Sequence, residues 1–443
     1  MTSGTFCLTV LLTGLSTLSA AQTTAVFGSH EEVIVPFDTL DHDLFFAHFR
    51  TTPDFDRVRI VGMGEATHGT HEFFALKCET FKYLVLHHGY TVFGIEASFG
   101  GCCFINDVLA TGGDVDAAMQ HFDFWTWRTQ EVRELLVWIR DHNRGRPSKE
   151  QVRFCGFDMQ DMLAPVQYIN STCMDPSEAA LATIVKPVTD VSEVELYRRT
   201  NDPEMRYRDT LRTVYAEMEH WLAYRSLELG PDSSGSRFRT LRRCASTFRQ
   251  ALGASSGSFA YRDSCMAVNV AAIQQETGAK MFLWAHNGHI NLTYSEGTSA
   301  LMGEPMGGYL KERYADAYLA IGFMFSGGSF QAVKGPNSLS GAALKYVFAR
   351  RSLYKGLMEC QVPEIERNSL STAFEHTGHN FLFIDLDRTT DALFSTPQRA
   401  YDMGAVYMSP RRSSSSISAK QQFNGLVYVR QTTEARPFHV PRR

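Results

Sequence analysis

Short apolar runs that alternate with segments of helical periodicity limit most strongly how this chain can fold. Runs of this length, bounded by polar or glycine-rich residues, are typical of buried strands. They occupy residues 58–63, 91–95, 152–157, 280–284, 317–325 and 381–384. Segments with an apolar stripe at helical spacing lie between them, at residues 72–88, 131–143 and 264–276. The alternation predicts an α/β fold with a mainly parallel central sheet flanked by helices.

Two stretches depart from this rhythm. Residues 176–262 are rich in Arg, Glu and Leu and include a helix-like segment at residues 204–229. We interpret 176–262 as a helical insertion and a candidate cap over the functional site, set between a first part of the α/β core at residues 35–175 and a second part at 263–435. Residues 410–418 contain four consecutive serines. We predict a flexible loop there, because the next apolar run begins only at residue 426.

The N-terminal segment has an apolar run at residues 6–18, followed by small residues up to Ala21. This length suits the core of a secretory signal and is too short to span a bilayer. We therefore predict a signal peptide at residues 1–21 and a secreted or periplasmic protein. The alternative is a disordered start on a cytoplasmic chain, because Arg50 is the first Lys or Arg in the sequence. No later run is long enough for a membrane span.

Charge and cysteine content exclude some classes of function. The formal charge is −5, and no dense Lys/Arg stripe occurs, so we expect no nucleic-acid partner. The nine cysteines contain no Cys-x-x-Cys pair, and Cys78 and Cys155 lie inside apolar patterns that predict buried thiols. The redox compartment and the oligomeric state are both left open by the sequence.

Acidic residues and histidines follow four of the predicted strands. In parallel α/β sheets, ligands gather at the carboxyl ends of the strands. We therefore expect these side chains to meet at one edge of the sheet: Glu65, His68, Glu96, Asp158, His286 and His289. Carboxylates that converge on histidines form a site able to activate water. Asp158 has an equally good interpretation as the cap of the next helix.

Other polar and aromatic residues have plainer interpretations. A single histidine after a strand is usually a hydrogen-bonded loop residue, and we interpret His71, His87 and His88 in this way. The aromatic cluster at residues 122–127 suits a substrate pocket, and it suits ordinary core packing equally well.

Several motifs together resemble the erythromycin esterase family. They are GEATHGTHEFF at residues 64–74, Glu96 at its strand end, WTWRTQEV at residues 125–132, the pair Arg262 and Asp263, and WAHNGHI at residues 284–290. They occur in the family's order and at similar spacing, and the likeness runs from about residue 40 to residue 435. The resemblance implies a hydrolase without a cofactor that, in characterised members, opens macrolide lactone rings and so confers antibiotic resistance.

The resemblance also implies roles for individual residues. His68 looks like the general base, and Glu65, Glu96, Arg262, His286 and His289 resemble the supporting polar residues of that site. An unperturbed histidine titrates at about 6.5, which suits a base at neutral pH, and a neighbouring carboxylate stabilises its charged form. Arg262 or a second histidine could supply the hydrogen bonds that the tetrahedral oxyanion needs. Because some members have no known macrolide activity, the predicted substrate is a small carboxylic ester or lactone, with a macrolide as one candidate.

Three alternatives remain open. His68 with His71, and His286 with His289, are spaced i, i+3 and could ligate zinc together with Glu65 and Glu96. This is not the His-Glu-x-x-His spacing of zincins, so a metal is not favoured. Residues 253–257 match Gly-x-Ser-x-Gly, but an Arg-rich helical segment precedes them where a serine hydrolase has a strand. The third alternative is an exported binding or polysaccharide-associated protein without turnover, which the intact polar set argues against.

Overall fold

The computed structural model describes residues 34–37, 55–173, 178–192, 195–196, 206–229, 235–254, 259–294, 302–334, 357–363 and 370–438. The predicted signal peptide at residues 1–21 lies outside the described residues. The chain divides into two compact units, which are described separately below. Unit 1 comprises residues 1–89, 285–337 and 356–436, and unit 2 comprises residues 90–284, 338–355 and 437–443. Mainly parallel strands flanked by helices confirm the predicted α/β class.

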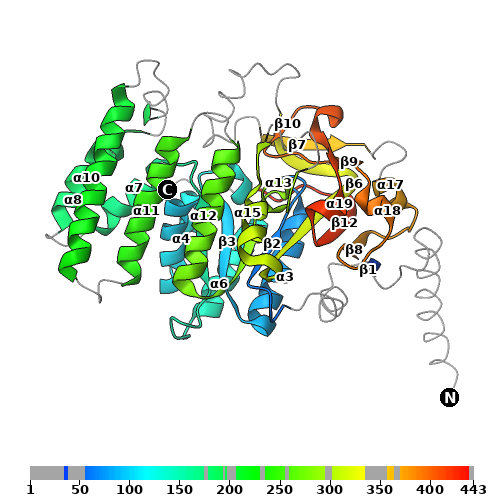
Figure 1. Ribbon diagram of the computed structural model, residues 1–443, viewed down its shortest axis with the longest axis horizontal. Helices are drawn as coiled ribbons and strands as arrows, with labels where there is room; N and C mark the ends of the chain where they lie inside the picture. Colours follow the sequence, from blue (N-terminus) through cyan, green and yellow to red (C-terminus); the bar gives the residue numbers. More distant parts are fainter. Residues whose placement is uncertain are drawn as a thin grey trace. The chain divides into compact units, whose positions relative to one another are not determined.

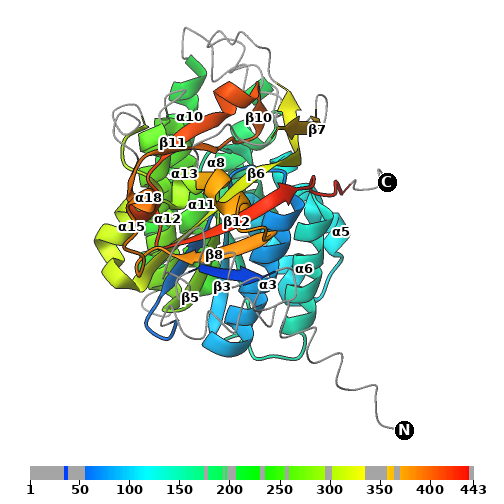
Figure 2. The ribbon, with the colours of Figure 1, turned by 90° about the vertical axis from the view of Figure 1, so that its right-hand side faces the viewer.

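Unit 1 is built around a long strand, β6. Its strands lie in the order β1-β8-β12-β6-β2, and β7 and β10 also pair with β6. The bounds are β1 Ile34–Phe37, β2 Ile60–Met63, β6 Tyr318–Lys334, β7 Leu357–Val362, β8 Phe381–Asp385, β10 Val406–Tyr407 and β12 Gly425–Thr432. Strand β12 runs parallel to β6 and antiparallel to β8, between the two (Figure 2). A second, two-stranded sheet pairs β9 Gln398–Tyr401 with β11 Ser414–Ile417.

The longest helix of unit 1 is α3, His71–His88. Phe73, Phe81 and Leu84 are buried at helical spacing along it, which explains why this segment forms a helix. Gly89 ends it in the left-handed conformation, with φ 70°. The other helical segments are α13 Asn287–Ile290, α15 Met306–Tyr314, η5 Ala315–Ala317, α17 Leu370–Glu375, α18 Ala392–Ser395, η6 Pro410–Ser413 and α19 Ala419–Gln422.

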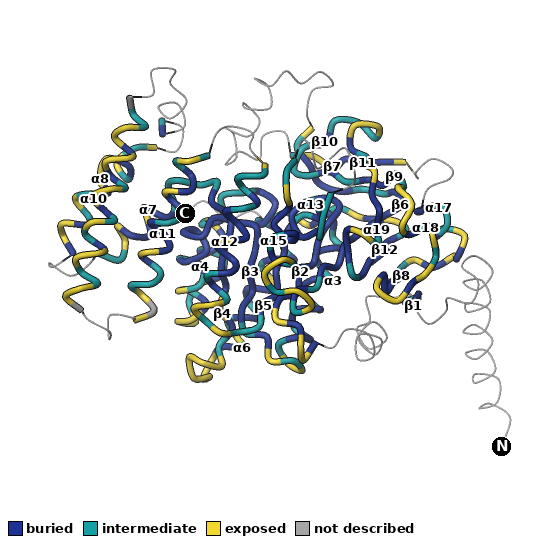
Figure 3. Tube along the Cα trace, in the orientation of Figure 1, coloured by how far each residue is buried: buried dark blue, intermediate teal, exposed yellow. Residues whose placement is uncertain are grey.

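Unit 2 combines a parallel three-stranded sheet with layered helices. Strand β3 Tyr90–Ser98 lies between β4 Arg153–Asp158 and β5 Lys280–Trp284. The helices are α4 Phe99–Thr111, α5 Val115–Ala118, η1 Met119–His121, η2 Trp125–Trp127, α6 Gln130–Asn143, α7 Leu163–Thr172, α8 Ala179–Thr189, α10 Arg206–Leu229, α11 Ser236–Gly253 and α12 Phe259–Thr277. Helices α8 and α10 pack on α7 and α11, on the far side from the strands (Figure 1). Their outer faces are exposed, whereas β3 is buried (Figure 3).

The described part of residues 176–262 is helical, and α12 runs through position 262. The division into two core parts and a capping insertion stays a prediction. The buried free thiols predicted at Cys78 and Cys155 are confirmed. The flexible loop predicted at residues 410–418 is wrong, because η6 and β11 occupy that segment and β11 pairs along its whole length with β9. Among the described helices, none is long and apolar enough to cross a membrane.

Candidate active site

The loop that follows β2 carries Glu65 and His68 between two glycines. A side chain at Gly64 would overlap the Asn287 amide, and one at Gly69 would overlap the backbone of Gln331. The loop therefore needs glycine at both ends because its neighbours approach its backbone so closely. Gln331 N donates to Gly69 O at 2.9 Å, and Asn287 N donates to Glu65 O at 2.9 Å. These contacts hold the Glu65–His68 backbone in place.

A chain of three side chains links α3 to this loop. The Lys77 ammonium from α3 donates to Oε2 of Glu65, and both side chains are 0% exposed. The other carboxylate oxygen, Oε1, lies 2.6 Å from Nδ1 of His68. Burial alone would raise the pKa of Glu65, but Lys77 and His68 outweigh it and lower that pKa. Glu65 is therefore an ionised carboxylate that accepts the Nδ1 proton of His68.

The His68 ring is consequently fixed in one neutral tautomer. With the proton on Nδ1, the lone pair is on Nε2, the nitrogen that does not face Glu65. The His286 ring lies beside it, with the two ring centroids 5.0 Å apart. His286 precedes α13, and its Nδ1 accepts a hydrogen bond from Gly288 N at 3.2 Å. The two histidine rings thus meet within unit 1, tilted by 57° to each other.

A segment that follows β9 completes this cluster. Met403 N donates to Ala66 O at 2.8 Å. Next to it, Asp402 Oδ1 lies 3.5 Å from Nε2 of His286. A Cβ built on Gly404 would lie 3.7 Å from Cδ2 of His68, which is ordinary van der Waals contact. Residues 402–404 therefore line the histidine pair. We call Glu65, His68, Lys77, His286 and Asp402 the histidine cluster.

Unit 2 holds a separate group of charges around Arg262. Nε and Nη2 of Arg262, which lies on α12, donate to the two carboxylate oxygens of Asp158 at 3.1 and 2.9 Å. Nη2 also donates to Oε1 of Glu96 at 2.6 Å. Burial would lower the pKa of Arg262, but the two carboxylates outweigh it and raise that pKa. We call these three residues the arginine cluster. Its arginine is therefore engaged by two carboxylates.

Most of the residues selected from the sequence therefore occur in two groups. Glu65, His68 and His286 meet in unit 1, and Glu96, Asp158 and Arg262 meet in unit 2. That both groups share one edge of the sheet stays a prediction. His289 lies on α13, and its side chain is buried. The interpretation of His71, His87 and His88 as loop residues is wrong, because all three lie within helix α3, at its two ends.

Sequence reasoning missed Lys77 and Asp402. A signal for Lys77 was present, because a lysine sits where the apolar stripe of α3 requires a buried side chain. Asp402 lies in a polar stretch between short strands and carries no comparable signal.

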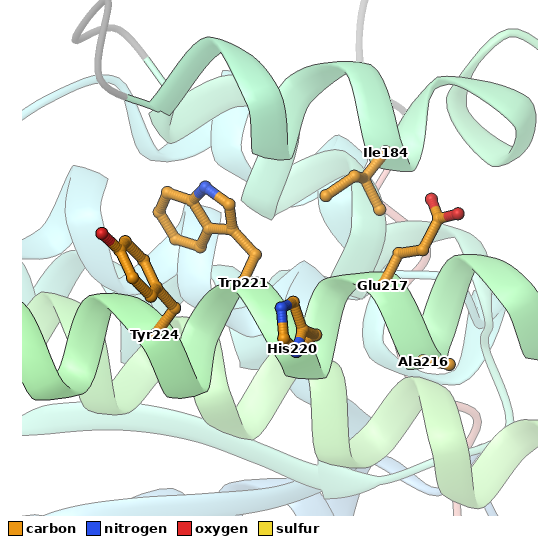
Figure 4. A pocket seen from close by; sticks show the side chains of 6 residues that line it. All are labelled: Ile184, Ala216, Glu217, His220, Trp221 and Tyr224. Carbon is orange, nitrogen blue, oxygen red and sulfur yellow. The ribbon is translucent and has the colours of Figure 1, made fainter.

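The aromatic cluster at residues 122–127 proves to be largely core. Trp127 is fully buried, donates from Nε1 to Glu96 O at 2.9 Å, and packs edge to face against Trp284. A hollow elsewhere in unit 2 lies between α8 and α10 (Figure 4). Its lining is Ile184, Ala216, Glu217, His220, Trp221 and Tyr224. Glu217 and His220 are exposed there, so water screens any charge they carry, and we place the candidate active site elsewhere.

The described residues contain no group of three or more His, Cys, Asp or Glu side chains arranged to hold a metal ion. Metal independence itself stays a prediction. The Lys77 ammonium does bear on it, because a metal ion at Glu65 would have to compete with this positive charge. Residues 255–257 of the Gly-x-Ser-x-Gly match lie outside the described residues. The segment before them is helix α11, in place of the strand that a nucleophilic serine needs.

Comparison with known proteins gives one family match. A family model described as erythromycin esterase matches residues 85–432, most of the chain. The matched span includes the arginine cluster, His286 and His289, and it begins after the loop that carries Glu65 and His68.

The chain is also similar to individual relatives, and to solved structures in its fold. Erythromycin esterase type II of Escherichia coli is 23% identical over 295 residues, which cover 60% of this chain and 68% of the relative. The putative hydrolase YbfO of Bacillus subtilis (strain 168) is 24% identical over 411 residues, 85% of this chain and 84% of the relative. A succinoglycan biosynthesis protein has a similar structure, with a TM-score of 0.73 at 17% identity over 96% of this chain and 98% of that chain. A mutant erythromycin esterase in its open conformation has a TM-score of 0.63 at 20% identity, over 92% and 99%.

Proposed function

The chain belongs to the erythromycin esterase family, and from this premise we propose that it is a hydrolase that cleaves a carboxylic ester or lactone with water activated by His68. One observation carries the proposal: Glu65, held ionised by Lys77, lies 2.6 Å from Nδ1 of His68. A buried lysine, a carboxylate and a histidine in series leave one nitrogen, Nε2, able to accept a proton. No protein nucleophile is needed for the reaction.

The chemistry follows from this tautomer. Nε2 of His68 takes a proton from water as the water oxygen bonds to the carbonyl carbon of the substrate. Glu65 stabilises the imidazolium that results, and the carbonyl oxygen becomes a tetrahedral oxyanion. When the intermediate collapses, the bond to the alkoxy oxygen breaks and the imidazolium returns the proton to that oxygen. The products are a carboxylic acid and an alcohol, or a ring-opened hydroxy acid if the substrate is a lactone.

Relatives support a particular substrate class. Two proteins of Escherichia coli that resemble this chain are named erythromycin esterases of type I and type II, so a macrolide lactone is the first candidate. In that case the reaction would open the ring and confer antibiotic resistance. The histidine cluster itself requires only an ester carbonyl, and it supports other acyl substrates equally well. Within the arginine cluster, Arg262 holds the Glu96 carboxylate, and a supporting role for both stays a prediction.

The test is a hydrolysis assay on purified full-length protein. Erythromycin, p-nitrophenyl butyrate and a simple γ-lactone are incubated with it, and mass spectrometry detects the addition of one water. The matched pair of variants is His68→Ala on the loop after β2 and His71→Ala at the first residue of α3. We expect hydrolysis that His68→Ala abolishes and His71→Ala retains. If the wild type hydrolyses none of the three compounds, or if His68→Ala retains full activity, the proposal is wrong.

A further inference from the structure

We propose that Asp402 is a positioning residue that holds the His286 ring as a hydrogen-bond donor, with its proton on Nε2, opposite the proton-accepting Nε2 of His68. This inference rests on the proposed function, because it assigns His286 to the oxyanion of the same hydrolysis. Asp402 comes from a part of the chain far from both histidines in sequence, and no motif indicates it. Its evidence is the set of contacts around the His286 ring.

The backbone fixes one nitrogen of that ring. Gly288 N is a donor and lies 3.2 Å from Nδ1 of His286, so Nδ1 must present its lone pair. The neutral ring then carries its proton on Nε2. That nitrogen faces Oδ1 of Asp402 at 3.5 Å, and the carboxylate favours a proton on the nearer nitrogen. Two independent contacts therefore select the same tautomer.

The Asp402 carboxylate is itself held in place. Ser415 Oγ donates to its second oxygen, Oδ2, at 3.3 Å, and Asp402 N donates to Ser413 O at 3.0 Å. Both serines belong to the four consecutive serines at residues 413–416, which we call the serine run. The serine run lies beside Asp402 because β11 pairs with β9. The Asp402 side chain is 26% exposed and that of His286 is 12% exposed, while the two atoms that face each other, Oδ1 and Nε2, are buried.

The two histidines of the cluster thus have opposite properties. Glu65 accepts a hydrogen bond from Nδ1–H of His68 and so leaves a proton acceptor at Nε2, whereas Asp402 favours the proton on Nε2 of His286 and so leaves a donor there. Ester hydrolysis requires both: an acceptor for the proton of water and a donor to the oxyanion. The two rings are neighbours, with their centroids 5.0 Å apart. Asp402 gains and loses no proton in this scheme.

At 3.5 Å, Nε2 of His286 and Oδ1 of Asp402 are in electrostatic contact but are farther apart than in a hydrogen bond. A strong N–H···O hydrogen bond measures about 2.7–3.2 Å, so Asp402 orients the Nε2 proton without fully engaging it. The Nε2–H of His286 can then donate a hydrogen bond to the carbonyl oxygen of the substrate as negative charge develops on that oxygen.

The first experiment is nuclear magnetic resonance of full-length protein labelled with ¹⁵N-histidine, which needs no substrate. Spectra are recorded well above the ordinary histidine pKa of about 6.5, and the His286 signals are assigned by their loss in His286→Gln. We expect the wild-type ring to be protonated on Nε2, and a measurable fraction to move to Nδ1 in Asp402→Ala. The exposed Asp316 on η5 provides the control, Asp316→Ala. A wild-type ring protonated on Nδ1, or an Asp402→Ala ring as fully Nε2-protonated as the wild type, would overturn the inference.

The second experiment is a double-mutant cycle on turnover of erythromycin or p-nitrophenyl butyrate. Removing an oxyanion donor costs about 100- to 1,000-fold in kcat, so weakening its orientation in Asp402→Ala should cost about 10-fold or more, with KM changed little. Because Asp402 acts through His286, Asp402→Ala should add no loss in a His286→Gln background. Formate should restore part of the kcat of Asp402→Ala and none of that of the double variant. Additive losses would show that Asp402 has only a structural role.

The two experiments separate the inference from the function on which it rests. If the wild type hydrolyses neither compound, the proposed function is contradicted, and the tautomer measurement alone then decides the role of Asp402. If hydrolysis occurs but the cycle is additive, the proposed function stands and the inference is wrong.

Discussion

Replacing Lys77 with methionine tests the charge chain behind His68. In the wild type, both Lys77 and Glu65 are 0% exposed and form an ion pair. Methionine keeps the length and apolar stem of the side chain and removes the charge, so Glu65 becomes an unpaired buried carboxylate. Breaking a buried ion pair from one side costs about 3–5 kcal/mol, and we expect a loss of stability of this size at pH 7.

The matched control is Lys82→Met on the same helix. Lys82 pairs with Glu79 at 2.6 Å, but the two side chains are 24% and 28% exposed. A surface pair of this kind contributes about 0–1 kcal/mol, so the control should change stability by no more than that. A second comparison is Lys77→Met combined with Glu65→Gln. The double variant has no uncompensated buried charge, so it should be more stable than Lys77→Met alone. Its turnover should stay low, because His68 has lost the carboxylate beside Nδ1.

The effect of Lys77→Met should also depend on pH, with a defined sign. The pKa of Glu65 is lowered in the folded protein, so its ionised form stabilises the fold above the ordinary glutamate pKa, and this contribution is lost as the pH falls through the lowered value. In Lys77→Met, burial dominates and Glu65 takes up a proton at higher pH. A protonated carboxyl carries no charge to desolvate, so the difference from the wild type should shrink between neutral pH and about pH 4.

Urea unfolding at several pH values measures these differences, and hydrogen exchange of the α3 amides assigns them to unit 1. The reasoning is refuted if Lys77→Met costs no more than Lys82→Met, or if its cost is the same at pH 7 and pH 4.

Three further predictions concern the mechanism. His68→Ala should lower kcat by about 100-fold or more, the usual contribution of a general base, and circular dichroism should show an intact fold. If His68→Ala has a mild effect on kcat and His71→Ala a large one, the base is assigned to the wrong histidine. Exhaustive chelation should leave turnover nearly unchanged, and a loss that zinc or manganese restores would favour the metal-dependent alternative. Ser255→Ala should keep wild-type turnover because α11 is a helix, and covalent labelling of Ser255 by a fluorophosphonate would contradict this.

The regular elements of the fold could largely be predicted from the sequence. The run at residues 280–284 coincides with β5, and the run at residues 381–384 extends by one residue in β8. Both are buried runs of the length that strands need, so local pattern and tertiary environment agree. The prediction for β6 was too short, because Gly327 and Gly328 suggest a strand end, whereas β7 and β12 continue to pair there.

The site was predicted only in part, for a physical reason. Glu65 and His68 are neighbours on one loop, so their contact is local and follows from the glycines around them. Asp402 meets His286 only because β9 and β11 pair and Met403 bonds to Ala66, and no local pattern encodes such contacts. The serine run at residues 413–416 shows the same limit. Its composition is typical of a loop, but pairing with β9 satisfies the backbone of β11, in which three of the four residues are serines.

The position of β12 has a consequence for how the protein is made. This strand is among the last described segments to be synthesised, yet it lies between β6 and β8, which the ribosome produces earlier. Until β12 is synthesised, the edges of β6 and β8 that pair with it have no partner strand, and apolar side chains nearby stay exposed to solvent. Nascent chains in this condition aggregate or recruit chaperones. Asp402 also emerges long after His68 and His286. The histidine cluster is therefore assembled late, and a nascent or prematurely terminated chain carries both histidines without the carboxylate that orients the second.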